Sequence, residues 1–194
     1  MSYHIYTTSS LILKRKNFGE ADLMLYVLTK DFGLILASAK SARLLASKNK
    51  GFLQEYSFVS ISCVKGKNGW KITNVVGEGD TFSDYRKGGQ EILAKVSSVL
   101  IKMITGESPH REVFLTVKSG FEFLKNLEEK YVLNFEVLIV LRILFELGYV
   151  ARDDNSEKFL NDMTHWDIDL LKKVEIEKRN LIDLINKALK ESHL

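Results

Sequence analysis

A change in the spacing of apolar residues near residue 80 constrains the fold of this chain more than any other feature. Before it, apolar residues form short runs separated by turns, which is typical of β-strands. After it, they recur every three or four positions, as over residues 92–104, which is typical of amphipathic helices. We therefore predict an α+β protein with a strand domain over residues 1–80 and an all-helical domain over residues 81–194.

Five segments of the first domain have the length and composition of strands. The clearest turn is Asn68-Gly69, because both residues tolerate the positive φ of a tight type I′ hairpin. Five strands in about 70 residues favour a small barrel, and the oligonucleotide/oligosaccharide-binding (OB) fold is the leading five-stranded architecture. An SH3-like barrel would show nearly the same pattern and stays open as an alternative. The predicted strands are residues 11–16, 23–29, 34–39, 56–64 and 70–76.

The second domain is predicted to contain about five helices. Ser108 and Pro109 are typical of an N-cap followed by the first helical residue. Residues 134–146 are apolar on all sides, which predicts a central helix packed by the others. Residues 153–156 are predicted to cap a further helix that ends near residue 174, and the last helix is expected over residues 175–190.

The positive charge of the chain is concentrated in the first domain. The whole chain has a formal net charge of +3. Residues 1–80 contain 11 Lys and Arg against 6 Asp and Glu, a balance of +5. Residues 81–194 contain 17 against 19, a balance of −2. Such an asymmetry favours a polyanionic partner for the basic domain.

Ten of the eleven basic residues of the first domain fall in three segments that contain no acidic residue. In an OB fold, the first and third segments would flank the loops between strands 1 and 2 and between strands 4 and 5, where such barrels hold oligonucleotides. Phe18 and Trp70 lie beside these segments and are candidates for stacking on bases, although Trp70 would also suit a barrel core. Any one of the lysines, taken singly, would be ordinary in a solvent-exposed loop. The candidate nucleic-acid-binding residues are Lys14, Arg15, Lys16, Lys40, Arg43, Lys48, Lys50, Lys65, Lys67 and Lys71.

No pattern in the sequence indicates an active site or a bound cofactor. The chain has neither a G-x-x-x-x-G-K-[ST] phosphate loop nor a G-x-G-x-x-G loop. Its four histidines are scattered and its one cysteine, Cys63, lies in an apolar run, so neither a zinc site nor a disulfide is predicted. No run of about 18 uncharged apolar residues and no secretory signal is present, so we expect a cytoplasmic protein. The prediction is a non-enzymatic protein.

Several motifs, in order along the chain, resemble the pattern of the RecO family of bacterial recombination mediators. In the first domain they are Asn17-Phe-Gly-Glu-Ala-Asp22, Leu28-Thr-Lys-Asp-Phe-Gly33 and Ala39-Lys-Ser-Ala-Arg43. The family has a Y/F-G-E-x-D turn, a T-x-x-x-G turn and an A-K-G-A-R segment at these places, so Ser41 replaces a glycine. In the second domain, the segments that resemble the family's helices are His110-Arg-Glu-Val-Phe114 and the stretch from Phe135 to Tyr149.

The resemblance implies a protein of DNA repair and homologous recombination, built from an OB domain and a helical domain. It implies binding of single- and double-stranded DNA, annealing of complementary strands, and help in loading the recombinase onto coated single strands. The implied partners are RecR, the C-terminal tail of single-stranded DNA-binding protein and, indirectly, RecA, and the implied location is the bacterial nucleoid. Many members bind zinc through cysteine pairs after the position of Tyr149, and this chain lacks those cysteines.

Residues 40–50 are predicted to contribute most to binding. This segment is the longest acid-free basic stretch, it has the composition of an adaptable loop, and its Lys40 and Arg43 match the family's A-K-G-A-R segment.

Two other classes of function stay open at this point: a basic OB adaptor for RNA or ribosomes, and a scaffold whose lysines only aid solubility. Fluorescence of Trp70, titrated with single-stranded DNA, duplex DNA and structured RNA, would separate these alternatives.

Overall fold

The structure, a computed structural model, describes residues 4–44, 51–79, 81–152 and 156–192. Its backbone contacts divide the chain into two compact units. The first comprises Met1–Asp84 and Thr105–Arg111, and the second comprises Tyr85–Ile104 and Glu112–Leu194. The segment Thr105–Arg111 connects two helices of the second unit but is grouped with the first, an arrangement that the order of elements along the sequence does not indicate.

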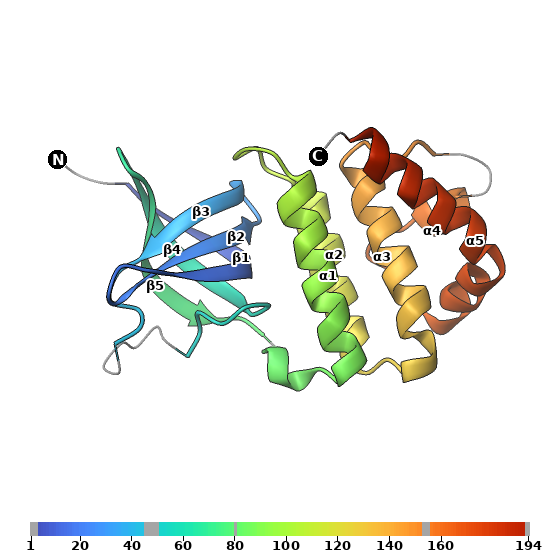
Figure 1. Cartoon of the computed structure of the whole chain (residues 1–194), viewed down its shortest axis with the longest axis horizontal. Coiled ribbons are helices and arrows are strands. Elements are labelled where there is room, and N and C mark those ends of the chain that lie inside the picture. The colour runs from blue at the N-terminus through green and yellow to red at the C-terminus, as the bar shows by residue number, and fades with distance from the viewer. Residues whose placement is uncertain (1–3, 45–50, 80, 153–155, 193–194) are drawn as a thin grey trace. The chain divides into compact units, whose positions relative to one another are not determined.

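The first unit is a closed five-stranded barrel with the strand order β1-β2-β3-β5-β4 (Figure 1). Its strands are β1 (Ile5–Phe18), β2 (Asp22–Thr29), β3 (Gly33–Ala39), β4 (Phe58–Gly66) and β5 (Gly69–Gly77). β1 pairs with both β2 and β4, and β3 pairs with β5 in the parallel sense. The OB fold predicted from the sequence is confirmed, and β1 extends further toward the N-terminus than its apolar residues indicated.

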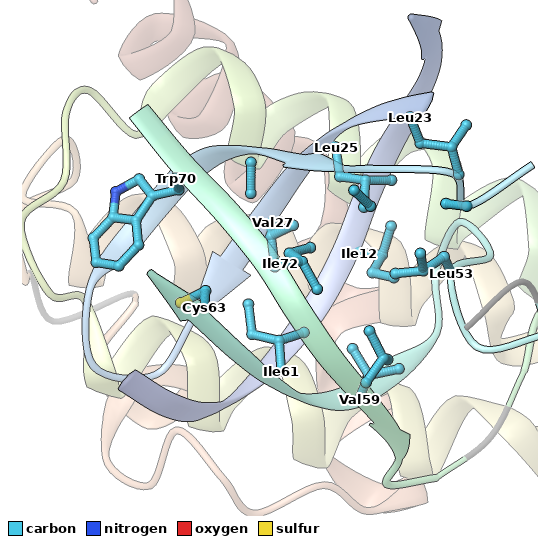
Figure 2. Close-up of a cluster of buried hydrophobic side chains, with 14 of the residues drawn as sticks. Ile12, Leu23, Leu25, Val27, Leu53, Val59, Ile61, Cys63, Trp70 and Ile72 are labelled. Carbon is cyan, nitrogen blue, oxygen red and sulfur yellow. The ribbon is translucent and has the colours of Figure 1, made fainter. Parts of the chain in front are cut away.

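Alternation along the strands sends every second side chain into the barrel, where the apolar ones form a core. Figure 2 shows Trp70 at one end of this core, next to Cys63. The Trp70 ring centroid lies 5.3 Å from that of Phe32 and 5.7 Å from that of Tyr6. Burial raises the pKa of the Cys63 thiol, which keeps it in its unreactive protonated form. The residues that are fully buried in this core include Ile12, Leu25, Val27, Ile35, Leu53 and Ile61.

Two of the RecO-like motifs bind each other at one end of the barrel. The Ser41 N–H donates to the Asp22 carboxylate at 2.7 Å, and the Arg43 N–H donates to the Ala21 carbonyl at 2.9 Å. Ser41 has a φ of 54°, in the left-handed region that favours glycine. A glycine would adopt this region without strain, and the serine here does so at some cost.

The third motif forms the turn between β2 and β3. The Thr29 hydroxyl donates to the Gly33 carbonyl at 2.9 Å and accepts from the Phe32 N–H at 3.0 Å. Gly33 has a φ of 69°, and a Cβ atom there would overlap the backbone carbonyl of Ser108. Glycine is therefore required both by the turn and by the close approach of the segment Thr105–Arg111.

The second unit is helical, and its long helices run from green to red in Figure 1. In its described residues the helices are α1 (Lys87–Met103), α2 (Arg111–Lys125), α3 (Val132–Glu146), α4 (Glu157–Leu160) and α5 (Ile168–Glu191). α3 packs against α1 and α5 and is buried on nearly all sides, as predicted for a central helix. None of the described helices is long and apolar enough to cross a membrane.

The predicted boundaries of two helices differ from the structure. α2 begins at Arg111, two residues after the predicted start at Pro109. The prediction of two helices meeting near residue 174 is wrong, because α5 runs unbroken from Ile168. It begins there because the Asp167 side chain accepts from the Leu170 N–H at 2.6 Å as an N-cap. Residues 153–155 of the predicted cap lie outside the described residues.

Candidate nucleic-acid interface

One row of side chains crosses four strands on the outside of the barrel and has a lysine at each end. The register aligns Lys16 of β1 with Met24 of β2 and Met24 with Ser38 of β3. The parallel pairing of β3 with β5 then aligns Ser38 with Lys71. Because neighbouring strands lie about 4.8 Å apart, this row spans roughly 14 Å.

A second row lies on the same face, two residues further along each strand. It contains Lys14, Tyr26 and Leu36 in register. Leu36 is 47% exposed, and the Lys16 ammonium lies 5.6 Å from the centroid of the Tyr26 ring. Aromatic and aliphatic surface flanked by cations is what sequence-tolerant single-strand binders offer to bases and phosphates. We call the surface formed by the two rows, Lys14, Lys16, Met24, Tyr26, Leu36, Ser38 and Lys71, the outer strand face.

Tyr26 and Leu36 were missed by reasoning from the sequence. Residues 23–29 look apolar on both faces in the sequence, so the segment reads as a strand buried on both sides. The available signal was the alternation itself: Met24 and Tyr26 occupy the positions between the fully inward Leu23, Leu25 and Val27.

Three further candidates lie at the end of the barrel where β1 turns into β2. Phe18 is 56% exposed at the end of β1, and Lys40 and Arg43 are exposed just after β3. The Arg43 guanidinium donates one hydrogen bond, at 3.3 Å, to the Gly19 carbonyl, which holds it beside the β1–β2 turn. Its other N–H groups remain suited to a phosphate. Lys48 and Lys50 lie outside the described residues.

Arg15 does not join the outer strand face. It pairs in register with Leu25, one position away from the residues opposite Lys14 and Lys16. Its guanidinium donates to the Gln54 side-chain oxygen at 2.9 Å, and its backbone N–H donates to a Glu55 carboxylate oxygen at 2.8 Å. These bonds give Arg15 a structural contact with the segment before β4.

The remaining candidates lie on the β4–β5 hairpin, and they differ in whether they form an ion pair. Lys65, Lys67 and Lys71 are all exposed. Lys65 forms an ion pair with Glu107, and its ammonium lies 5.3 Å from the centroid of the Trp70 ring. Among the eight candidate cations that the structure describes, Lys65 is the only one that is paired with a carboxylate side chain.

Trp70 is placed in the barrel core rather than on the surface. It is 4% exposed and packs against Tyr6 and Phe32. A base therefore finds no open face of this ring, so the structure favours the core alternative for Trp70 over the stacking one. Phe18 and Tyr26 present the accessible aromatic surface next to the cations.

The second unit carries a separate apolar groove of about 800 Å³ between α1, α3 and α5. Val137 and Val140 of α3 line it, and Leu133 beside them is 59% exposed. Lys95 and Lys178 lie among its lining residues. Apolar clefts with a few polar groups are the usual form of a site for a small molecule or a peptide.

The buried charge of Arg142 is satisfied by hydrogen bonds within the second unit. Arg142 is 1% exposed, and its guanidinium donates to the carbonyls of Phe159, Met163 and His165 at 2.9, 3.1 and 2.8 Å. Burial lowers its pKa to about 10. Within the described part of the chain, no group of three or more His, Cys, Asp or Glu side chains is arranged to hold a metal ion.

The barrel topology and the basic outer strand face define this chain as an OB-fold protein with a helical unit. The sequence profile described as "Recombination protein O N terminal" matches residues 1–76, which contain nearly all of the five strands. The similarity to proteins named "DNA repair protein RecO" continues into the helical unit. The one from Thermodesulfovibrio yellowstonii is 30% identical over 168 residues, covering 79% of this chain and 65% of that protein.

Two further proteins of that name are similar to this chain over different lengths. The one from Rubrobacter xylanophilus is 23% identical over 164 residues, covering 82% of this chain and 64% of that protein. The one from Dehalococcoides mccartyi is 39% identical over 64 residues, covering 33% of this chain and 25% of that protein. Residues 1–76 thus match the N-terminal domain of the RecO family, and the similarity to RecO proteins extends over much of the helical unit. The chain spans less than two thirds of the length of each of these relatives.

Proposed function

We propose that this protein is a mediator of DNA repair and homologous recombination in a bacterial cell, and that it binds single-stranded DNA across the outer strand face. One observation carries the proposal: Lys16 and Lys71 end a row that crosses four strands, with the half-buried Tyr26 and the exposed Leu36 beside it. The names of the relatives, all DNA repair proteins, supply the cellular setting.

The proposed mechanism requires no covalent chemistry. The lysines neutralise phosphates and release counterions, while the aromatic and aliphatic side chains support unstacked bases. Two strands that are each partly neutralised repel one another less, so complementary strands anneal faster. Duplex binding, through the same cations, and help in loading the recombinase onto coated strands belong to the same proposal. The protein is proposed to be non-enzymatic and to need no cofactor.

The proposal is tested by replacing Lys14, Lys16 and Lys71 with alanine. Loss of three phosphate contacts should make the slope of log affinity against log salt shallower by about 2 and slow strand annealing. The control replaces Lys102, Lys173 and Lys190 of the helical unit, which changes the net charge equally and should leave both quantities unchanged. Equal losses in the two variants would contradict the proposal, and tighter binding to structured RNA than to single-stranded DNA would favour the adaptor for RNA or ribosomes.

Residues 40–50 are proposed to extend the interface beyond the β1–β2 turn. Lys40 and Arg43 are exposed beside Phe18, at the end of the outer strand face. Replacing Lys40, Arg43, Lys48 and Lys50 with alanine is expected to lower single-strand affinity and annealing rate together. If the affinity and the annealing rate both equal those of the parent protein, residues 40–50 do not contact the DNA and the interface is limited to the outer strand face.

We propose partners on the same footing. The groove between α1, α3 and α5 suits the C-terminal tail of single-stranded DNA-binding protein, because its apolar floor matches a chain end with apolar side chains. A labelled tail peptide should bind the parent protein and lose affinity for the Val140→Asp variant, whereas equal affinity would exclude the groove. RecR and, indirectly, RecA complete the proposed set.

A further inference from the structure

Glu107 is held against the barrel by a segment that is anchored at two points. It belongs to Thr105–Arg111, which joins α1 to α2 and groups with the first unit. Its carboxylate pairs with Lys65 on the β4–β5 hairpin. The next residue, Ser108, packs its backbone so closely on Gly33 that no Cβ atom would fit there. The carboxylate is therefore placed by packing of the backbone and not only by attraction to Lys65.

We propose that Glu107 prevents Lys65 from contacting the DNA backbone and so determines the path of the bound strand. This inference rests on the proposed function, and it defines where the bound strand leaves the outer strand face. A carboxylate and a phosphate compete for the same ammonium group. The strand is therefore expected to pass Lys71 and to leave the barrel without contacting Lys65.

The ionisation of Glu107 supports this role. The hydrogen bond from Lys65 lowers the pKa of the Glu107 carboxyl, and the nearby Trp70 indole N–H contributes in the same direction. The carboxylate thus keeps its charge at neutral pH. The side chains of Lys65 and Glu107 are 54% and 42% exposed, so a phosphate could reach the ammonium once the carboxylate was removed.

The neighbouring cations show that the effect is local. Lys67 and Lys71 belong to the same hairpin, are exposed, and make no ion pair with any residue that the structure describes. Pairing with Glu107 therefore removes only Lys65 from the cations available to DNA, and the row from Lys16 to Lys71 stays accessible.

The test measures binding of a labelled oligothymidine to the Glu107→Gln variant, with the full chain folded. Freeing Lys65 for one phosphate should raise the affinity about fivefold at about 50 mM salt and steepen the salt slope by about 0.7. The gain should then shrink about threefold at about 200 mM salt. Glu128→Gln is the matched control, because Glu128 also pairs with an exposed lysine, Lys130, but lies in the helical unit.

A double-mutant cycle with Lys65→Ala shows whether the gain passes through that lysine. Lys65→Ala alone should change the affinity less than about twofold, and adding Glu107→Gln should give no further gain. An equal gain in Glu128→Gln, or a gain that persists without Lys65, would overturn the inference. Parent-like affinity of Glu107→Gln would overturn it while leaving the proposed function standing. Absence of DNA binding by both the parent and Glu107→Gln would overturn both.

Discussion

The cations of the outer strand face and the buried Arg142 of the helical unit are in opposite states. In the barrel, Lys14, Lys16 and Lys71 are exposed and make no ion pair within the described ranges. In the helical unit, Arg142 is buried and donates to three carbonyls, and Lys95 pairs with Glu136 at 2.8 Å. Cations whose hydrogen bonds are satisfied inside the protein stabilise it, whereas cations left in water can exchange counterions for phosphates. The state of these cations distinguishes the outer strand face from the interior of the helical unit.

The largest expected effect comes from removing the buried charge. Arg142→Met should lower the free energy of unfolding by about 3–5 kcal/mol, since one buried carbonyl and two partly buried ones lose their donor at about 1 kcal/mol or more each. The guanidinium also lies 4.3 Å from the centroid of the Trp166 ring, a cation–π contact that methionine replaces only in part. Urea unfolding measures the loss, with the exposed Arg179→Met as control. A loss of unfolding free energy below about 1 kcal/mol would contradict the stabilising role of the Arg142 hydrogen bonds, on which the comparison rests.

The next effect tests whether packing holds Glu107, the acid that pairs with Lys65 of the barrel. Gly33→Ala should cost about 2–4 kcal/mol, because the new Cβ adds an overlap with Ser108 to the strain of a positive φ. Gly19→Ala is the matched control: its φ is 57° and no atom lies within 4 Å of the new Cβ. The control should cost about 1 kcal/mol, from strain alone. Equal costs in thermal or urea unfolding would show that the segment Thr105–Arg111 is not packed on the barrel.

A smaller effect concerns the buried carboxylate of the helical unit. Glu146 accepts from the Thr116 hydroxyl at 2.8 Å. Burial raises its pKa to about 7, while the hydrogen bond from Thr116 and the charge of Arg142 oppose the rise. A raised pKa means that the folded state binds the Glu146 proton more tightly than the unfolded state does. The contribution of Glu146 to the unfolding free energy is therefore most favourable at low pH and is lost as the pH rises through about 7.

The parent protein should therefore lose about 1–2 kcal/mol of unfolding free energy between about pH 5 and pH 8, a figure reduced for the partial exposure of the group. Glu146→Gln should remove most of this dependence and be the more stable protein at pH 8. Glu122→Gln, on the exposed face of α2, should keep the parent's pH profile. A parent protein whose unfolding free energy does not change between these pH values would contradict the raised pKa assigned to Glu146.

Local patterns in the sequence predicted the strands and the fold, but the interface depends on pairing between strands. Asn68-Gly69 correctly marked the β4–β5 hairpin, because a tight turn is encoded by adjacent residues. The expected type I′ turn is wrong, since Gly69 has a positive φ but Asn68 does not. The alignment of Lys71 with Ser38 depends on a parallel pairing between distant strands. Similarly, nothing local to Lys65 indicates its contact with Glu107, 42 positions away.

The salt dependence of single-strand affinity tests the central claim most directly. Five described cations lie on the outer strand face or at its β1–β2 end: Lys14, Lys16, Lys40, Arg43 and Lys71. Contacts with about five phosphates predict a slope of log affinity against log salt near −3.5, and the Lys14, Lys16 and Lys71 variant should reduce it to about −1.4. A flat salt response of the parent protein, or a slope that the variant leaves unchanged, would contradict the account.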